Sequence, residues 1–235
     1  MAYTFFRIDK DASSLPSLAA KYKELRLAAL QNSPASFSST YETEAQFSDQ
    51  VWLSRINTPN KETFICAAVD GESSGSIDPS TVALETCEWV AQVTLLGPVS
   101  ADDYALPSEA SQPEVASDRD EEKWQMLSLY TLPQHRGKGL GKRLCKEAFQ
   151  FLASSRREYH GHGVPKQVRV RIMVKPDNHV TLGLYRSMGF VDAGKCTLEE
   201  ALRANGDADL LPPGSLPEKF KGRNGKIMAL VLDRV

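Results

Sequence analysis

The chain is poor in cysteine, and its cysteines are scattered. None of them forms a C-x-x-C pair or a His/Cys cluster, so no spacing typical of a zinc site is present. His160 and His162 share a glycine-rich stretch, which predicts solvated loop histidines rather than metal ligands. Widely spaced cysteines in apolar runs predict buried free thiols, no metal, and a reducing compartment, which means the cytoplasm or the nucleus. The four are Cys66, Cys87, Cys145 and Cys196.

Other absences narrow the class of protein further. No apolar run is long enough to span a membrane, and no signal-peptide core follows Met1. The formal net charge is only −2, so the sequence predicts neither a nucleic-acid partner nor a membrane partner. With 41% hydrophobic and 25% charged residues and no internal repeat, residues 1–235 predict one soluble globular domain.

The most informative positive feature is a glycine-rich turn, Gln134-His135-Arg136-Gly137-Lys138-Gly139-Leu140-Gly141. It follows an apolar run from Trp124 to Pro133 and opens a helical pattern from Lys142 to Ser154. Glycines let the backbone approach a ligand closely, because no Cβ is in the way. The free N–H groups and the dipole of a new helix favour negative charge. The turn therefore predicts a phosphate or pyrophosphate site.

Two familiar phosphate-binding turns do not fit this pattern. A P-loop needs Ser or Thr after Gly-Lys, but Arg143 follows Gly141-Lys142. A dinucleotide fingerprint needs G-x-G-x-x-G and a later acid, but the spacing here is G-x-G-x-G and Glu158 has no strand before it. A turn that binds nothing remains an alternative, although three glycines and a basic first turn are costly for mere connection.

Two motifs resemble the GCN5-related N-acetyltransferase (GNAT) superfamily. Gln134-x-x-Gly137-x-Gly139 is similar to the family's acetyl-CoA pyrophosphate loop, and Asn178 to Phe190 resembles its N-x-x-A-x-x-x-Y-x-x-x-G-F element. The motifs stand in the family's order, with a strand pattern at Gln167–Val174 between them. A softer likeness at Arg26–Leu30 points to the small-molecule branch, and the resemblance covers about Phe5 to Phe190.

Periodicity predicts a β-α-α-β-β-β-α-β-α-β-β order. This is an α/β (α+β) fold with a mixed, mostly antiparallel six- to seven-stranded sheet and helices on both faces, and the resemblance implies splayed fourth and fifth strands. Residues 71–80 predict a long hairpin loop. Residues 100–122 are acidic and poor in apolar side chains, which predicts a solvated, mobile insertion, and residues 195–224 predict a second insertion.

The resemblance also implies a donor site. Main-chain groups of Leu129 and Thr131 would bind the pantetheine arm and polarise the acetyl carbonyl, and amides from Arg136 to Lys142 would hold the pyrophosphate. Asn178 would bind pantetheine or only cap its helix. The full set is Leu129, Tyr130, Thr131, Gln134, Arg136, Gly137, Lys138, Gly139, Leu140, Gly141, Lys142, Asn178 and Tyr185.

Three residues are candidates for catalysis. Tyr185 falls on the family's general-acid position, and a phenol with a pKa near 10 suits protonation of a leaving thiolate; the alternative is that it only packs in the core. Many relatives have a glutamate where this chain has Gln125, which accepts no proton. Glu121 shares that strand face, so it is the predicted base through an ordered water, with proton loss to bulk water as the alternative.

The resemblance implies an acetyl-CoA-dependent N-acyltransferase (EC 2.3.1.-) acting by direct attack in a ternary complex. Its acceptor is expected to be a small primary amine such as an amino acid or polyamine. Two alternatives stay open: a protein N-terminal or lysine acetyltransferase, and a catalytically silent acyl-CoA-binding regulatory module, which Gln125 favours. The acyl-chain length of the donor stays open, as does a homodimer, a common state in that family.

Overall fold

A computed structural model of the chain describes residues 2–69, 83–155 and 163–234. The predicted hairpin loop at 71–80 and the two loop histidines, His160 and His162, lie outside the described residues.

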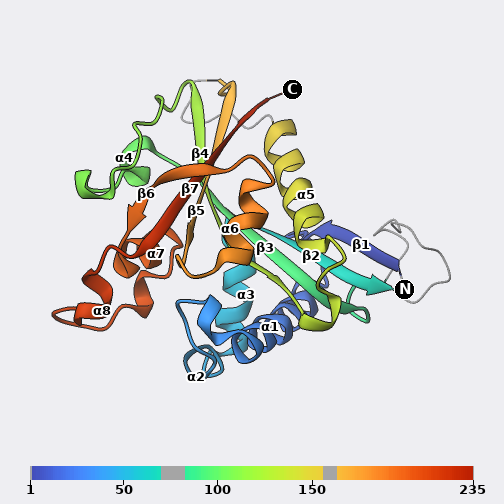
Figure 1. The fold of residues 1–235 in the computed structure, drawn as a ribbon. Helices are drawn as coiled ribbons and strands as arrows, with labels where there is room; N and C mark the ends of the chain where they lie inside the picture. Colours follow the sequence, from blue (N-terminus) through green and yellow to red (C-terminus); the bar gives the residue numbers. More distant parts are fainter. Residues whose placement is uncertain (1, 70–82, 156–162, 235) are drawn as a thin grey trace. The chain divides into compact units, whose positions relative to one another are not determined.

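Seven strands hydrogen-bond in the order β1-β2-β3-β4-β5-β7-β6 (Figure 1). Three neighbouring pairs, β1–β2, β5–β7 and β6–β7, are antiparallel, whereas β4 and β5 are parallel. The predicted mixed, mostly antiparallel sheet is therefore confirmed. The strands are β1 (Ala2–Arg7), β2 (Lys61–Val69), β3 (Glu88–Val99), β4 (Glu121–Thr131), β5 (Gln167–Val174), β6 (Val191–Cys196) and β7 (Gly225–Asp233).

Helices α1, α3, α5 and α6 occupy the predicted places between the strands, whereas α2, α4, α7 and α8 were not predicted. Local capping signals fix where two of the helices begin. The side chains of Ser48 and Asn178 each accept a hydrogen bond from the first turn that follows, as expected of N-caps. No helix of the described chain has the length and apolar character needed to cross a membrane. The helices are α1 (Leu15–Asn32), α2 (Tyr41–Glu44), α3 (Asp49–Asn57), α4 (Ala101–Tyr104), α5 (Leu140–Ser154), α6 (His179–Arg186), α7 (Leu198–Ala204) and α8 (Glu218–Lys221).

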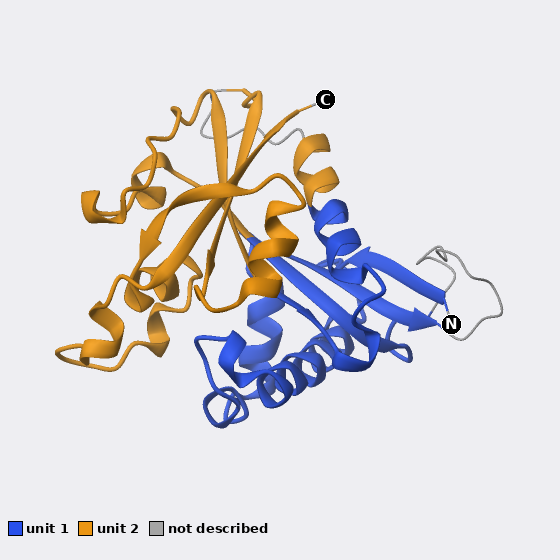
Figure 2. Cartoon of the chain, in the orientation of Figure 1, with its two compact units in different colours: residues 1–95, 128–148 blue, residues 96–127, 149–235 orange. Residues whose placement is uncertain are grey.

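The chain divides into two compact units (Figure 2). Unit 1 comprises residues 1–95 and 128–148, and it holds β1, β2, α1, α3 and the glycine-rich turn. Unit 2 comprises residues 96–127 and 149–235, and it holds β5, β6, β7 and α6. The expectation of a single domain stays a prediction.

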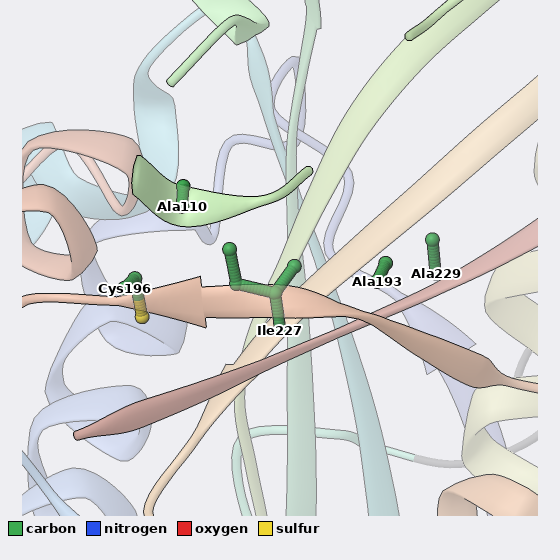
Figure 3. Close-up of a cluster of buried hydrophobic side chains, with 5 residues drawn as sticks. All are labelled: Ala110, Ala193, Cys196, Ile227 and Ala229. Carbon is green, nitrogen blue, oxygen red and sulfur yellow. The ribbon is translucent and has the colours of Figure 1, made fainter. Parts of the chain in front are cut away.

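The first insertion differs from its prediction. Residues 100–122 were expected to be solvated, but Tyr104 and Ala110 are buried, and Glu121 and Glu122 already belong to β4. Ala110 packs in a cluster with four residues of β6 and β7 (Figure 3): Ala193, Cys196, Ile227 and Ala229. The solvated character was wrong at these positions because Ala110 packs on this apolar cluster and the Tyr104 ring covers the guanidinium of Arg171.

The second insertion, residues 195–224, also begins inside a strand. β6 continues to Cys196, and Thr197 and Glu200 then form a capping box that starts α7. Arg223 binds the Glu200 carboxylate through both terminal nitrogens, at 2.6 and 2.8 Å. Buried Leu202 and Phe220 show that this segment is folded onto unit 2.

A buried ion-pair group fixes the α1–α3 region of unit 1. Glu44 is fully buried and accepts hydrogen bonds from Arg26 at 2.6 and 3.0 Å and from Arg55 at 2.8 Å. Burial alone would raise the pKa of Glu44, but the hydrogen bond and charge of Arg26 and the charge of Arg55 outweigh it and hold the pKa below its ordinary value. The guanidinium of Arg26 also covers the Phe37 ring, 4.7 Å from its centroid.

Replacing Glu44 by Gln should therefore lower the free energy of unfolding by about 3–5 kcal/mol at neutral pH, because two cations lose their buried counter-ion. Since the folded-state pKa is depressed, the carboxylate stabilises the fold above the unfolded pKa, and this stabilisation is lost as the pH falls through the folded value. Urea denaturation at neutral and acidic pH measures the difference. The matched control is Glu42→Gln, on the exposed side of the same helix, with an expected change within about 0.5 kcal/mol. Equal losses in the two variants would contradict the assignment.

Candidate active site

The glycine-rich turn lies between the end of β4 and the start of α5. Gly137 and Gly139 have φ values of +76° and +73°, a left-handed conformation that favours glycine. A Cβ built on either would meet no atom within 4 Å among the described residues. The turn is therefore open to a ligand on this side, with the first turn of α5 beside it. The predicted helix start at Lys142 moves two residues earlier, to Leu140.

The cations of this turn bind protein groups of unit 1. Arg136 donates from Nε to the Thr131 carbonyl and from Nη2 to the Ser33 hydroxyl, both at 3.0 Å. Its guanidinium also lies 5.5 Å from the centre of the Tyr130 ring. Lys138 donates to the Tyr3 hydroxyl at 2.8 Å. These uncharged partners hold the two side chains against unit 1 without cancelling their charge, which favours an anion near the turn.

His135 is a positioning residue that the sequence did not reveal. The motif places it among surface residues, yet it is 4% exposed. Its Nδ1 lies 3.1 Å from the Tyr3 hydroxyl, and its Nε2 lies 3.5 Å from a Glu88 carboxylate oxygen. The imidazole thus ties the turn to β1 and β3. No local sequence pattern predicts this role of His135, because burial beside β1 and β3 depends on residues far along the chain.

β4 changes character along its length. Its parallel pairing with β5 covers Glu121–Gln125 against Gln167–Arg171, although both strands continue further. Ser128 then adopts φ +57°, a left-handed conformation that is uncommon for serine and marks an irregularity within the strand. This early end of the pairing agrees with the splayed strands that were expected. The residues expected at the pantetheine arm, Leu129 to Thr131, directly follow Ser128.

The second motif folds within unit 2 as a short helix and its two ends. Asn178 caps α6 by accepting a hydrogen bond from the Thr181 amide at 3.2 Å, so its capping role is confirmed. The helix α6 ends at Arg186, and Gly189, at φ +94°, lies just beyond it. Tyr185 is 4% exposed, and its ring centre lies 5.2 Å from that of Phe190. The Tyr185 side chain therefore packs in the core, whether or not its hydroxyl also acts in catalysis.

The two β4 candidates for proton transfer are also placed within unit 2. Glu121 is buried, and its carboxylate accepts a hydrogen bond from Arg169 Nε at 2.8 Å. Gln125 Oε1 accepts from Arg171 Nε at 2.8 Å, and its Nε2 donates to Asn205 Oδ1 at 3.0 Å. Partners on alternate residues of β5 show that Glu121 and Gln125 share one strand face. Within the described ranges, no group of three His, Cys, Asp or Glu side chains suits a metal ion.

Part of the chain is similar to a known protein family. Residues 111–192 match the model of the acetyltransferase (GNAT) domain. Arabidopsis thaliana NAA60, solved with a bisubstrate analogue, is 14% identical, with 97% of this chain and 99% of that chain covered and a TM-score of 0.51. A GNAT-family acetyltransferase from Streptococcus pneumoniae is 14% identical, with 98% and 99% covered and a TM-score of 0.51. Salmonella typhimurium yncA, solved with its cofactor acetyl-CoA, is 13% identical, with 100% and 96% covered and a TM-score of 0.50. No curated protein matches.

The ion pair at Glu121 generates a stability prediction. Replacing Glu121 by Gln should lower the free energy of unfolding by about 1–3 kcal/mol, because Arg169 loses a charged, buried hydrogen-bond partner. Chemical denaturation measures this loss. Glu114→Gln, at an exposed position before β4, is the control and should change the stability by no more than about 0.5 kcal/mol. A Glu121→Gln protein as stable as the unmodified chain would show that the pair does not hold β4 to β5.

Proposed function

We propose that the chain transfers an acetyl group from acetyl-CoA to a primary amine of a small molecule, because residues 111–192 match the acetyltransferase (GNAT) domain model and the fold is similar to that of GNAT-family structures. The acceptor class is an amino acid, a polyamine or a similar compound. The amine attacks the thioester directly in a ternary complex.

One observation carries this proposal: the glycine-rich turn presents open backbone at the start of a helix. Gly137 and Gly139 are both left-handed, and a side chain at either position would point into space free of described atoms. A pyrophosphate carries the negative charge that helix amides and the helix dipole favour. The likeness to yncA, which was solved with acetyl-CoA, supports this choice of ligand.

Acyl transfer from a thioester has three requirements, and each has a candidate group in this chain. The carbonyl must be polarised, which the main chain of Leu129 and Thr131 would do. The leaving thiolate needs a proton, which Tyr185 would supply as general acid. The amine must be neutral, and Glu121 through a water is the proposed base. Because Arg169 holds the Glu121 carboxylate, proton loss to bulk water is the competing route.

Gln125 favours a second candidate function. The amide at this position is fixed between Arg171 and Asn205, so the chain has no carboxylate at the position where many relatives have their base. A catalytically silent module that binds acyl-CoA would have no need of one. A protein or peptide amine is the alternative acceptor if the chain is an enzyme. An acceptor panel separates these functions.

The panel measures thiol release from acetyl-CoA with polyamines, amino acids, amino sugars, arylalkylamines and short peptides. Turnover of a small amine would support the proposed function, and turnover of peptides alone would favour the protein acetyltransferase. If no acceptor reacts while acetyl-CoA still raises the melting temperature, the silent module is the better assignment. If acetyl-CoA does not stabilise the protein either, the pyrophosphate site is wrong.

The Gly139→Ala variant should bind CoA about tenfold more weakly. A left-handed alanine costs about 1–2 kcal/mol, and its methyl group would occupy the open side of the turn. Titration of CoA, followed by the shift in melting temperature, measures the affinity. Gly183→Ala in α6 adds the same methyl group at a position without a positive φ and should leave CoA affinity unchanged. Equal affinities in all three proteins would place the pyrophosphate elsewhere.

The Tyr185→Phe variant should lose about a hundred- to ten-thousand-fold in kcat while keeping its affinity for CoA, because only the proton donor is removed. The acetyl-transfer assay and the CoA titration together make this distinction. Tyr41→Phe removes a phenol from α2 and serves as the control, with the kcat of the unmodified protein expected. If Tyr185→Phe retains full kcat, Tyr185 packs the core and another group protonates the thiolate.

A further inference from the structure

Arg171 is a buried cation that the proposed chemistry does not use. The residue is 2% exposed and lies on β5. Its Nε donates to Gln125 Oε1 at 2.8 Å, and its Nη1 donates to the Tyr104 carbonyl at 2.6 Å and to Gln112 Oε1 at 3.0 Å. The guanidinium carbon lies 3.9 Å from the centre of the Tyr104 ring. Every one of these partners is uncharged.

Three other cations of unit 2 have carboxylate partners. Arg169 on β5 pairs with Glu121, Lys123 on β4 pairs with Asp118 at 2.8 Å, and Arg234, which directly follows β7, pairs with Glu122. No carboxylate of the described chain lies within 4.0 Å of the Arg171 guanidinium. Burial lowers the pKa of Arg171, because desolvation disfavours its charge. A buried charge without a counter-ion is costly, and the described residues supply no anion for Arg171.

The geometry of the group is suited to a ligand. Neutral acceptors fix the direction of the guanidinium without cancelling its charge, and Nη2 makes no hydrogen bond to any described residue. Gln125 and Arg171 form the last pair of the parallel β4–β5 register. Position 125 is also where the family resemblance expects the group that receives the proton of the acceptor amine. Arg171 therefore borders the place at which an acceptor is expected.

We propose that Arg171 binds a carboxylate of the acceptor, so that the substrates are amino acids or other amino carboxylates and not polyamines. This inference rests on the proposed function. The planar guanidinium binds a carboxylate through short, charge-assisted hydrogen bonds, and lysine does not reproduce that geometry. Glutamine at position 125 keeps the charge available, whereas a glutamate there would pair with Arg171 and compete with the ligand.

The experiment compares pairs of acceptors that differ only in the carboxylate. Suitable pairs are L-lysine with 1,5-diaminopentane and L-phenylalanine with phenethylamine, each measured with saturating acetyl-CoA. In the unmodified protein, kcat/KM should be at least about tenfold higher for the carboxylated member of the reactive pair. In Arg171→Gln this ratio should fall to about one, mainly through KM.

Gln125→Glu tests the same idea without removing the cation. The substitution preserves shape, supplies a carboxylate beside Arg171 Nε, and should also reduce the preference for carboxylated acceptors. Arg203→Gln is the control, because Arg203 is exposed and its ion-pair partner among the described residues is Glu199, one turn earlier in the same helix. It should keep the ratio of the unmodified protein. If Arg171→Gln does not fold, the ratio in Gln125→Glu decides the outcome.

The outcomes separate this inference from the proposed function. Equal rates with both members of each pair would overturn the carboxylate site while leaving the transferase in place. An unchanged ratio in Arg171→Gln and Gln125→Glu would also overturn it, and Arg171 would then only anchor Tyr104 and Gln112. If no amine of any class reacts although acetyl-CoA stabilises the protein, the proposed function fails, and the inference fails with it.

Discussion

The early end of the pairing between β4 and β5 is the constraint on which the rest of the site depends. Up to Gln125 and Arg171, β4 is held by ladder hydrogen bonds and by side-chain pairs such as Glu121 with Arg169. Beyond that point, Ser128 turns to a left-handed conformation. The strand can then direct main-chain groups to a ligand instead of to a neighbouring strand. The glycine-rich turn follows only a few residues later, so one continuous segment supplies most of the proposed donor site.

In the proposed donor site, backbone amides are the groups expected to hold the pyrophosphate. The side chains of Arg136 and Lys138 form hydrogen bonds with uncharged groups of unit 1. Their effect is to hold the turn in place, together with buried His135. A preorganised set of amides loses little freedom when it binds an anion, which is why such a site does not require exposed lysines and arginines.

Predictions from the sequence were accurate for features that depend on residues close together in the chain. The strand-to-helix position of the glycine-rich turn, the cap at Asn178 and the limits of β5 follow from nearby residues, and the structure confirms them. Predictions were less accurate where the partner lies far along the chain. Residues 100–122 look solvated by composition, yet Tyr104 is buried against Arg171, 67 positions away. Single-sequence periodicity has no means of showing which residue an inserted segment will cover.

The same long-range contact links two features that looked unrelated in the sequence. Gln125 first looked like the loss of a base, and Arg171 looked like the polar side of an alternating strand. Placed 2.8 Å apart and buried, they form one group whose net charge depends on residue 125. A glutamate there would neutralise the guanidinium, and a glutamine leaves it positive. If the charge of Arg171 binds the acceptor's carboxylate, the missing base and the substrate preference have the same cause. A glutamate at position 125 could accept a proton, but it would also pair with Arg171, whereas Gln125 leaves Arg171 without a carboxylate partner among the described residues.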